Sequence, residues 1–126
     1  TGRLASRRKQ LTMSAQGSQL AQVRPSGTSA SAAFTATIPT EVTRIFITNT
    51  TGSAAAFSLY HDDDGTTFDQ TTALFFGVSV SANTTTEFQC DPGAGIQMRA
   101  GGALAVQTDT GSALTFSIYG ITAEVE

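Results

Sequence analysis

Residues 42–69 read VTRIFITNTTGSAAAFSLYHDDDGTTFD, and this stretch decides the fold. It contains two runs rich in β-branched and aromatic residues, VTRIFIT and AAFSLYH, with the polar segment NTTGS between them. In the second run Phe57 and Leu59 alternate with Ser58 and Tyr60, which is the period-two pattern of a strand with one buried face. Polar segments with Gly and Asn between such runs are typical of hairpins. The stretch therefore predicts two antiparallel strands joined by a turn.

Runs of the same kind recur along the chain. They predict strands at residues 32–38, 41–48, 55–61, 71–81, 84–90, 96–100, 103–109 and 113–120. Both faces of 41–48 carry apolar side chains, so we expect this strand to be central or covered by a partner. Gly77 interrupts its run and predicts a bulge or bend. About eight strands at this spacing, with no helical period after residue 31, predict an all-β antiparallel β-sandwich of jelly-roll type; they do not define the strand order.

The composition agrees with an all-β protein and excludes some classes of site. The chain has 126 residues, the length of one domain with a core of useful size, and 13% of them are charged. Cys90 is the single cysteine and His61 the single histidine. Neither an internal disulfide nor a zinc site of the usual Cys/His kind can therefore form within one chain. We expect no bound cofactor.

The charges are distributed unevenly. Residues 1–24 hold five basic residues and no acidic one, whereas residues 25–126 hold two basic and ten acidic residues. We predict that residues 1–31 form a basic, extended N-terminal arm and that residues 32–126 form the sandwich. Within the arm QLAQVR could form an edge strand, and a disordered terminus is the alternative. The arm residues predicted to contact an acidic partner are Arg3, Leu4, Arg7, Arg8, Lys9, Leu11, Leu20, Val23 and Arg24.

The acidic segment after the second run contains the candidate ligands for a metal ion. Asp62, Asp64 and Asp69 offer carboxylate oxygens, which are the ligands that calcium prefers. Their spacing departs from the EF-hand pattern, so we expect a solvent-exposed loop and no metal. His61 adjoins these aspartates, but the chain has no second histidine and no G-x-S-x-G motif. We therefore expect no enzymatic activity, and we expect Cys90 to be a buried small apolar residue.

Nucleic acid, membrane and sugar ligands each lack part of the expected pattern. The basic arm has no interleaved aromatic residues and the rest of the chain is acidic, so we do not expect a nucleic-acid partner. No stretch approaches the ~20 apolar residues of a membrane helix, and we expect no membrane partner. Sugar sites usually offer an aromatic platform. The chain has no Trp, and Tyr60 and Tyr119 are the residues considered for that role.

The run TRIFITNTTGSAAAFSLYHDDDGTTFDQTTALFFGVSVSANTTTEF, residues 43–88, resembles a family of small β-sandwich proteins from tailed bacteriophages. The family shares a motif of the form I-x-x-x-N-T-x-x-x-A-x-x-F-x-L-Y-H-D-D-D-G, which begins here at Ile45. A second motif, G-x-L-x-V-x-T…A-x-T-F-x-I-Y-G, matches Gly102 to Gly120. The resemblance covers about residues 40–120 and leaves the basic arm outside.

The resemblance implies a structural protein of the phage particle, made in the host cytoplasm, rather than an enzyme. The leading hypothesis is a capsid decoration or cement protein that its N-terminal arm anchors to neighbouring subunits. The expected partners are the major capsid protein or other virion subunits, and we expect a homo-oligomer, with a trimer favoured. Two alternatives stay open. The first is a neck, tail or fibre-base protein of the same particle, and the second is a glycan-binding module.

Overall fold

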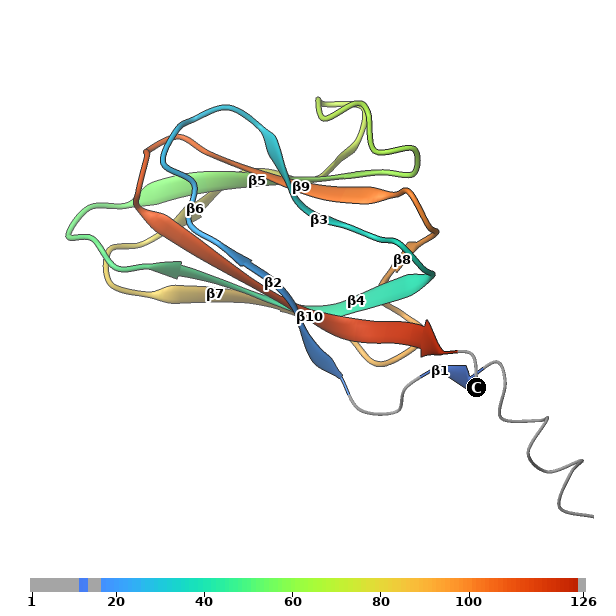
Figure 1. Ribbon diagram of the computed structural model, residues 1–126. Coiled ribbons are helices and arrows are strands. Elements are labelled where there is room, and N and C mark those ends of the chain that lie inside the picture. The colour runs from blue at the N-terminus through green and yellow to red at the C-terminus, as the bar shows by residue number, and fades with distance from the viewer. Residues whose placement is uncertain (1–11, 14–16, 125–126) are drawn as a thin grey trace, which may run out of the picture.

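The computed structural model describes residues 12–13 and 17–124, and every regular element in this part of the chain is a β-strand. The strands form two antiparallel sheets that pack face to face, which confirms the predicted all-β sandwich (Figure 1). Each of the eight predicted stretches overlaps one of the strands β3 to β10. The strands are β1 (Thr12–Met13), β2 (Ser18–Val23), β3 (Ser31–Thr35), β4 (Thr40–Asn49), β5 (Ala55–Asp62), β6 (Ala73–Val80), β7 (Thr85–Gln89), β8 (Ile96–Met98), β9 (Ala103–Thr108) and β10 (Leu114–Glu124).

The strand order is that of a jelly roll. In the six-stranded sheet β10 pairs with β1 and β2 on one side and with β4 on the other, and β4 also pairs with β7 and β8. The four-stranded sheet has the order β3-β9-β5-β6. Leaving out the short strands β1 and β8, the chain changes sheet at every connection except the one from β5 to β6. Two four-stranded layers connected in this way make up a jelly roll.

The connection between the first two runs crosses from one sheet to the other. β4 lies in the six-stranded sheet and β5 in the four-stranded sheet, so the prediction that these strands form a hairpin is wrong. The buried Asn49 side chain holds the crossover: its Nδ2 donates to the carbonyl oxygens of Ser53 and Val80 at 2.9 and 3.0 Å. Its Oδ1 accepts from the backbone N of Thr51 at 2.9 Å. Both strands have an apolar face to bury, and facing each other across one core satisfies both.

Alternate side chains of the central strands form the core. Phe57 from β5 and Phe116 from β10 meet between the sheets, with ring centroids 5.9 Å apart in an edge-to-face arrangement. Ile45 of β4 and Leu104 of β9 are fully buried beside them. β4 lies inside its sheet, as its apolar residues on both faces predicted. The core therefore joins strands from both sheets into one rigid unit.

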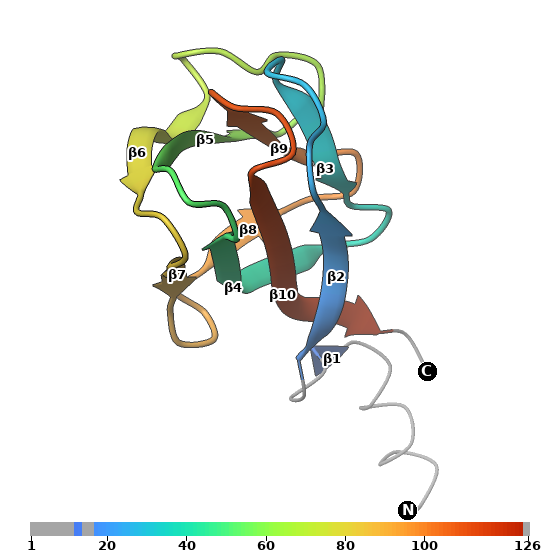
Figure 2. The same cartoon turned by 90° about the vertical axis from the view of Figure 1, so that its left-hand side faces the viewer.

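The N-terminal part of the described chain belongs to the sandwich. Ser18–Val23, considered above as an edge strand of the arm, pairs with β10 at the edge of the six-stranded sheet (Figure 2). Without β2, backbone groups and apolar surface along β10 would be exposed. The predicted boundary between residues 31 and 32 therefore does not separate arm from sandwich, because β2 lies on the arm side of it.

Candidate functional site

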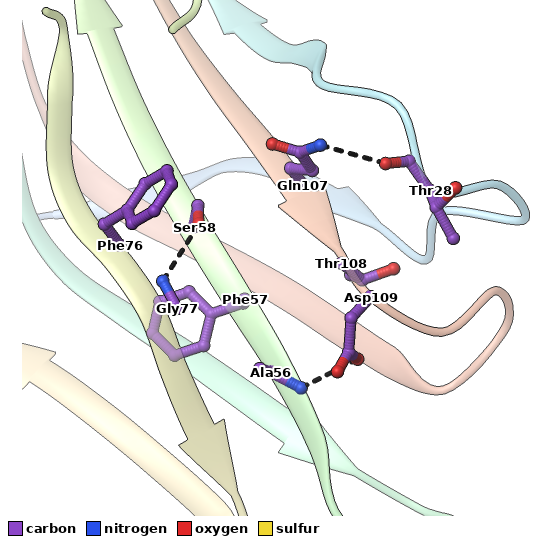
Figure 3. A pocket seen from close by; sticks show the side chains of 9 residues that line it. All are labelled: Thr28, Ala56, Phe57, Ser58, Phe76, Gly77, Gln107, Thr108 and Asp109. Carbon is purple, nitrogen blue, oxygen red and sulfur yellow. Dashed lines mark hydrogen bonds between the residues drawn. The ribbon is translucent and has the colours of Figure 1, made fainter. Parts of the chain in front are cut away.

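A cavity of about 270 Å³ opens on the outer face of the four-stranded sheet (Figure 3). Ala56 and Ser58 of β5 alternate with the core residues Phe57 and Leu59, so they point away from the core. β6 lies on one side of the cavity, and the end of β9 and the loop before β3 lie on the other. The lining residues are Thr28, Ala56, Phe57, Ser58, Phe76, Gly77, Gln107, Thr108 and Asp109.

A β-bulge in β6 shapes one side of the cavity and confirms the irregularity predicted at Gly77. Phe57 is paired with Val78 and Leu59 with Phe75, so two residues of β6 lie opposite Ser58 alone. Gly77 has a φ of 65°, and a Cβ there would meet no atom within 4 Å, so conformation rather than space requires glycine. The Gly77 N–H donates to Ser58 Oγ at 3.0 Å instead of to the ladder. Bulges of this kind re-aim side chains.

The re-aimed side chain is Phe76, whose ring is 58% exposed at the cavity. An exposed large apolar residue on an unpaired edge strand favours aggregation, and proteins usually avoid it. β6 is such an edge strand, and Leu74 on it is also 45% exposed. Leu74 and Phe76 therefore make this edge a candidate contact site for another molecule.

Polar side chains form the opposite side of the cavity. Asp109 accepts through Oδ1 from the backbone N of Ala56 at 2.9 Å, and the Gln107 amide donates to the carbonyl oxygen of Thr28 at 3.0 Å. Gln107 Oε1 also accepts from the Tyr60 hydroxyl at 2.5 Å. These bonds connect two strands and a loop, so the polar groups are held in place without a ligand.

The cavity offers hydrogen-bonding groups that are still free. Within the described residues, the second carboxylate oxygen of Asp109 accepts no hydrogen bond, and the Ser58 hydroxyl proton has no acceptor. Ser58 is only 8% exposed. Asp109 is the one ionisable residue in the lining, and acid–base chemistry needs further positioned groups. An aromatic ring beside free polar groups favours binding of a small polar molecule.

Of the two tyrosines considered as sugar platforms, Tyr60 is not free for that role, whereas Tyr119 is partly exposed. Tyr60 is 2% exposed, and its hydroxyl is used by Gln107. Tyr119 packs edge-to-face against Phe46 on the six-stranded sheet, with ring centroids 5.8 Å apart. Phe76 is not among the site residues predicted from the sequence. The sequence did contain a signal: adjacent residues of a strand point to opposite faces, so Phe75 and Phe76 cannot both face the core.

The acidic loop between β5 and β6 uses its carboxylates to order its own backbone. Asp62 Oδ2 accepts from the backbone N of Thr67 at 2.6 Å and of Thr66 at 2.9 Å. Hydrogen bonds from Thr67 and then Thr66 lower the pKa of Asp62 to about 2, because they stabilise the ionised carboxylate. The Thr71 hydroxyl and backbone N lower the pKa of Asp69 in the same way.

The candidate calcium ligands Asp62, Asp64 and Asp69 are therefore not brought together as a metal site. Among residues 12–13 and 17–124, no three His, Cys, Asp or Glu side chains are grouped closely enough to hold a metal ion. Asp64 is exposed, while Asp63 pairs with Arg99 at 2.9 Å. The loop is an ordered acidic surface above the sheet.

The ordering of this loop by Asp62 should depend on pH. The pKa of Asp62 falls from 3.8 to about 2 on folding. The stability that the ionised carboxylate gives to the folded loop is therefore fully present above pH 3.8 and is lost as the pH falls through about 2. We expect the Asp62 carboxyl carbon to titrate by NMR with a midpoint near pH 2, and the Thr66 and Thr67 amides to exchange faster below it. In Asp62→Asn the acid-dependent change in exchange should vanish. A midpoint near 3.8 would contradict the hydrogen bonds described.

The single histidine, His61, belongs to β5, and the single cysteine, Cys90, follows the end of β7 in the other sheet. His61 Nε2 is buried and has no hydrogen-bond partner within the described residues. Cys90 is half-buried, and its thiol lies 3.5 Å from the carbonyl oxygen of Thr43. Burial, with the nearby charges of Glu41 and Asp91, raises the pKa of the Cys90 thiol. A thiol that resists ionisation is a poor nucleophile.

Glu41 is a buried carboxylate that the sequence did not reveal. It is 4% exposed, and its Oε2 accepts from the backbone N of Gly93 at 2.6 Å and of Gly95 at 2.8 Å. A Cβ on Gly95 would lie 2.3 Å from the carbonyl oxygen of Val42, so only glycine fits there. Glu41 therefore holds the turn before β8 against β4, which is a structural role.

The residues predicted for the partner-binding arm divide into two groups. Leu20 and Val23 pack against the core, so their burial stabilises the sandwich itself. Arg24 Nε donates to the carbonyl oxygen of Ser112 at 3.1 Å and fastens the turn after β2. The remaining predicted residues lie outside the described part of the chain: Arg3, Leu4, Arg7, Arg8, Lys9 and Leu11.

Comparisons with known proteins identify no relative. No model of a protein family matches the chain, and neither a curated protein nor a solved structure matches it. In the part of the chain that the structure describes, no helix is long and apolar enough to cross a membrane.

Proposed function

We propose that this protein is a structural component of a tailed-bacteriophage particle, where it acts as a capsid decoration or cement protein. The sequence resemblance over about residues 40–120 motivates the proposal. The jelly roll supports it as a fold-level analogy, because this architecture recurs in viral capsid proteins. The partners of such a protein are the major capsid protein, other virion subunits and further copies of itself, with a trimer favoured.

The main support for the proposal is the position of β1, where the described chain enters the sandwich. β10 runs past Thr40, the first residue of β4, and its last residues pair with β1 in the register Met13 with Ala123. β1 therefore lies at one corner, beyond the region where the two sheets overlap (Figure 1). The residues before β1 include Arg3, Arg7, Arg8 and Lys9 and no acid.

The basic residues before β1 would let this corner bind an acidic neighbouring subunit during assembly. Residues 25–126 carry two basic and ten acidic side chains, so copies of the sandwich repel one another at low salt. A basic segment that reaches an acidic neighbour offsets that repulsion. Each exposed ion pair contributes only ~0.2–1 kcal/mol and weakens with salt, so several pairs must act together. Residues 1–11 are the segment we assign to this contact.

The test is incorporation into particles of the encoding phage. We expect the full-length chain in purified particles, and we expect deletion of residues 1–11 to lower its occupancy roughly tenfold or more. A variant with Arg3, Arg7 and Arg8 changed to Lys is the matched control, because it keeps every charge. Occupancy is measured by mass spectrometry and position by electron microscopy of the particle.

Each result of this test has a distinct meaning. Absence of the full-length chain from purified particles contradicts the proposed function. Full occupancy of the truncated chain contradicts the role of residues 1–11 and assigns the contact to the sandwich. Density for this chain at the neck, tail or fibre base contradicts the decoration role and supports the alternative role at that position in the same particle.

A further inference from the structure

We propose that the cavity beside Phe76 binds a carbohydrate ring. The Phe76 side chain is 58% exposed and lies at the cavity through the bulge at Gly77 (Figure 3). A sugar ring has an apolar C–H face and a rim of hydroxyl groups. An exposed aromatic ring covers the apolar face, while adjacent polar groups bind the hydroxyls. This inference does not depend on the virion role.

Two free groups in the cavity lining match sugar hydroxyls. The Asp109 oxygen that accepts no bond from described residues can accept from hydroxyls, and charged acceptors form the stronger hydrogen bonds. The Ser58 hydroxyl oxygen accepts a hydrogen bond from the Gly77 N–H, and its proton is still available to be donated. Ser58 is 92% buried, so water satisfies this donor poorly. A hydroxyl both donates and accepts and therefore fits both groups.

The site is preorganised by contacts that do not involve a ligand. The Ser58–Gly77 bond fixes the bulge, and the Asp109–Ala56 bond fixes the carboxylate over β5. Gln107 is held from both ends, by the Thr28 carbonyl oxygen and the Tyr60 hydroxyl. Groups already fixed before binding lose little conformational entropy when the ligand arrives.

The size of the cavity defines the class of ligand further. Its volume of about 270 Å³ lies just below the ~300–1,000 Å³ of sites for drug-sized molecules. It therefore holds one sugar ring, with the remainder of a glycan extending into solvent. A shallow site with a few polar contacts gives dissociation constants in the millimolar range.

The test is saturation-transfer NMR on the full chain with methyl glycosides of glucose, galactose, mannose and N-acetylglucosamine. We expect transfer from aromatic protons to the ring protons of at least one glycoside. Phe76→Ala should weaken its binding about tenfold or more, and Phe76→Tyr should keep it, because tyrosine retains the aromatic face. Leu74→Ala is the matched control, since Leu74 is an exposed apolar residue on the same strand outside the cavity lining.

Asp109→Asn tests the polar side of the site. Asparagine keeps an Oδ1 acceptor for the Ala56 N–H but loses the charged acceptor, so we expect binding to weaken while the thermal unfolding midpoint stays unchanged. Absence of transfer to all four glycosides overturns the proposal, and so does transfer that Phe76→Ala leaves intact. A further result would also overturn the carbohydrate proposal. If no glycoside binds, and Phe76→Ala and Leu74→Ala both abolish self-association in ultracentrifugation, the β6 edge is a contact between copies of the chain.

Discussion

Replacing Phe57 by alanine should lower the free energy of unfolding by about 3–5 kcal/mol. The Phe57 side chain is 3% exposed and contacts the rings of Phe116 in the opposite sheet and Phe75 in its own, with centroids 5.9 and 6.2 Å away. Truncation removes the link between the two layers and leaves a cavity that neighbouring strands cannot fill, because both sheets hold them in register. Urea unfolding followed by far-ultraviolet circular dichroism measures the loss.

Phe76→Ala is the matched control for this prediction. It is the same substitution on the adjacent strand, but the side chain is 58% exposed, so the expected change is within ~0.5 kcal/mol. Equal effects for the two variants would contradict the alternation of buried and exposed residues described for β5 and β6. A loss below ~1 kcal/mol for Phe57→Ala would place that ring outside the core.

Deleting residues 1–24 should destabilise the sandwich by about 3 kcal/mol or more, whereas deleting residues 1–11 should not. The longer deletion removes β2, whose Leu20, Ala21 and Val23 pack against the core. Full burial of a Val or Leu side chain stabilises by roughly 1.5–3 kcal/mol, and these residues are partly buried. The deletion also exposes the edge of β10 to pairing with other chains.

The shorter deletion serves as the control, because it leaves β1 and β2 in place. We expect it to retain the unfolding midpoint of the full chain in urea, and we expect the longer one to unfold earlier and to aggregate at lower concentration by light scattering. If both truncated chains unfold at the same midpoint, β2 does not support the sandwich, and residues 1–24 behave as the separate arm that the charge pattern predicted.

Local patterns predicted the strands because each strand has to bury one face. Period-two alternation placed a strand in each of the eight stretches, and the apolar residues on both faces of 41–48 correctly indicated a strand inside its sheet. Gly77 indicated the bulge, since an isolated glycine in a strand usually relieves a backbone conformation that other residues resist. The antiparallel sandwich class followed from the number and spacing of the strands.

The pairing of the strands could not be predicted in this way, because alternation indicates only that one face of a strand is buried and not which element covers it. The NTTGS segment looks the same whether the next strand pairs beside the first or crosses to the opposite sheet. The crossover depends on Asn49, whose side chain bonds to Ser53 and to Val80, a residue distant in sequence. For the same reason the acidic loop resembled a weak calcium site, although Asp62 and Asp69 bond to their own loop.

The sequence by itself determined the all-β class, the positions of the strands, the bulge at Gly77 and the separation of basic and acidic residues. Each of these properties depends on composition or on neighbours within a few positions. The tertiary structure decided the strand order, the inclusion of β2 in the sandwich, the burial of Glu41 and the cavity beside Phe76. These depend on contacts between residues such as Ser58 and Gly77, or Ala56 and Asp109, which only the folded chain brings together.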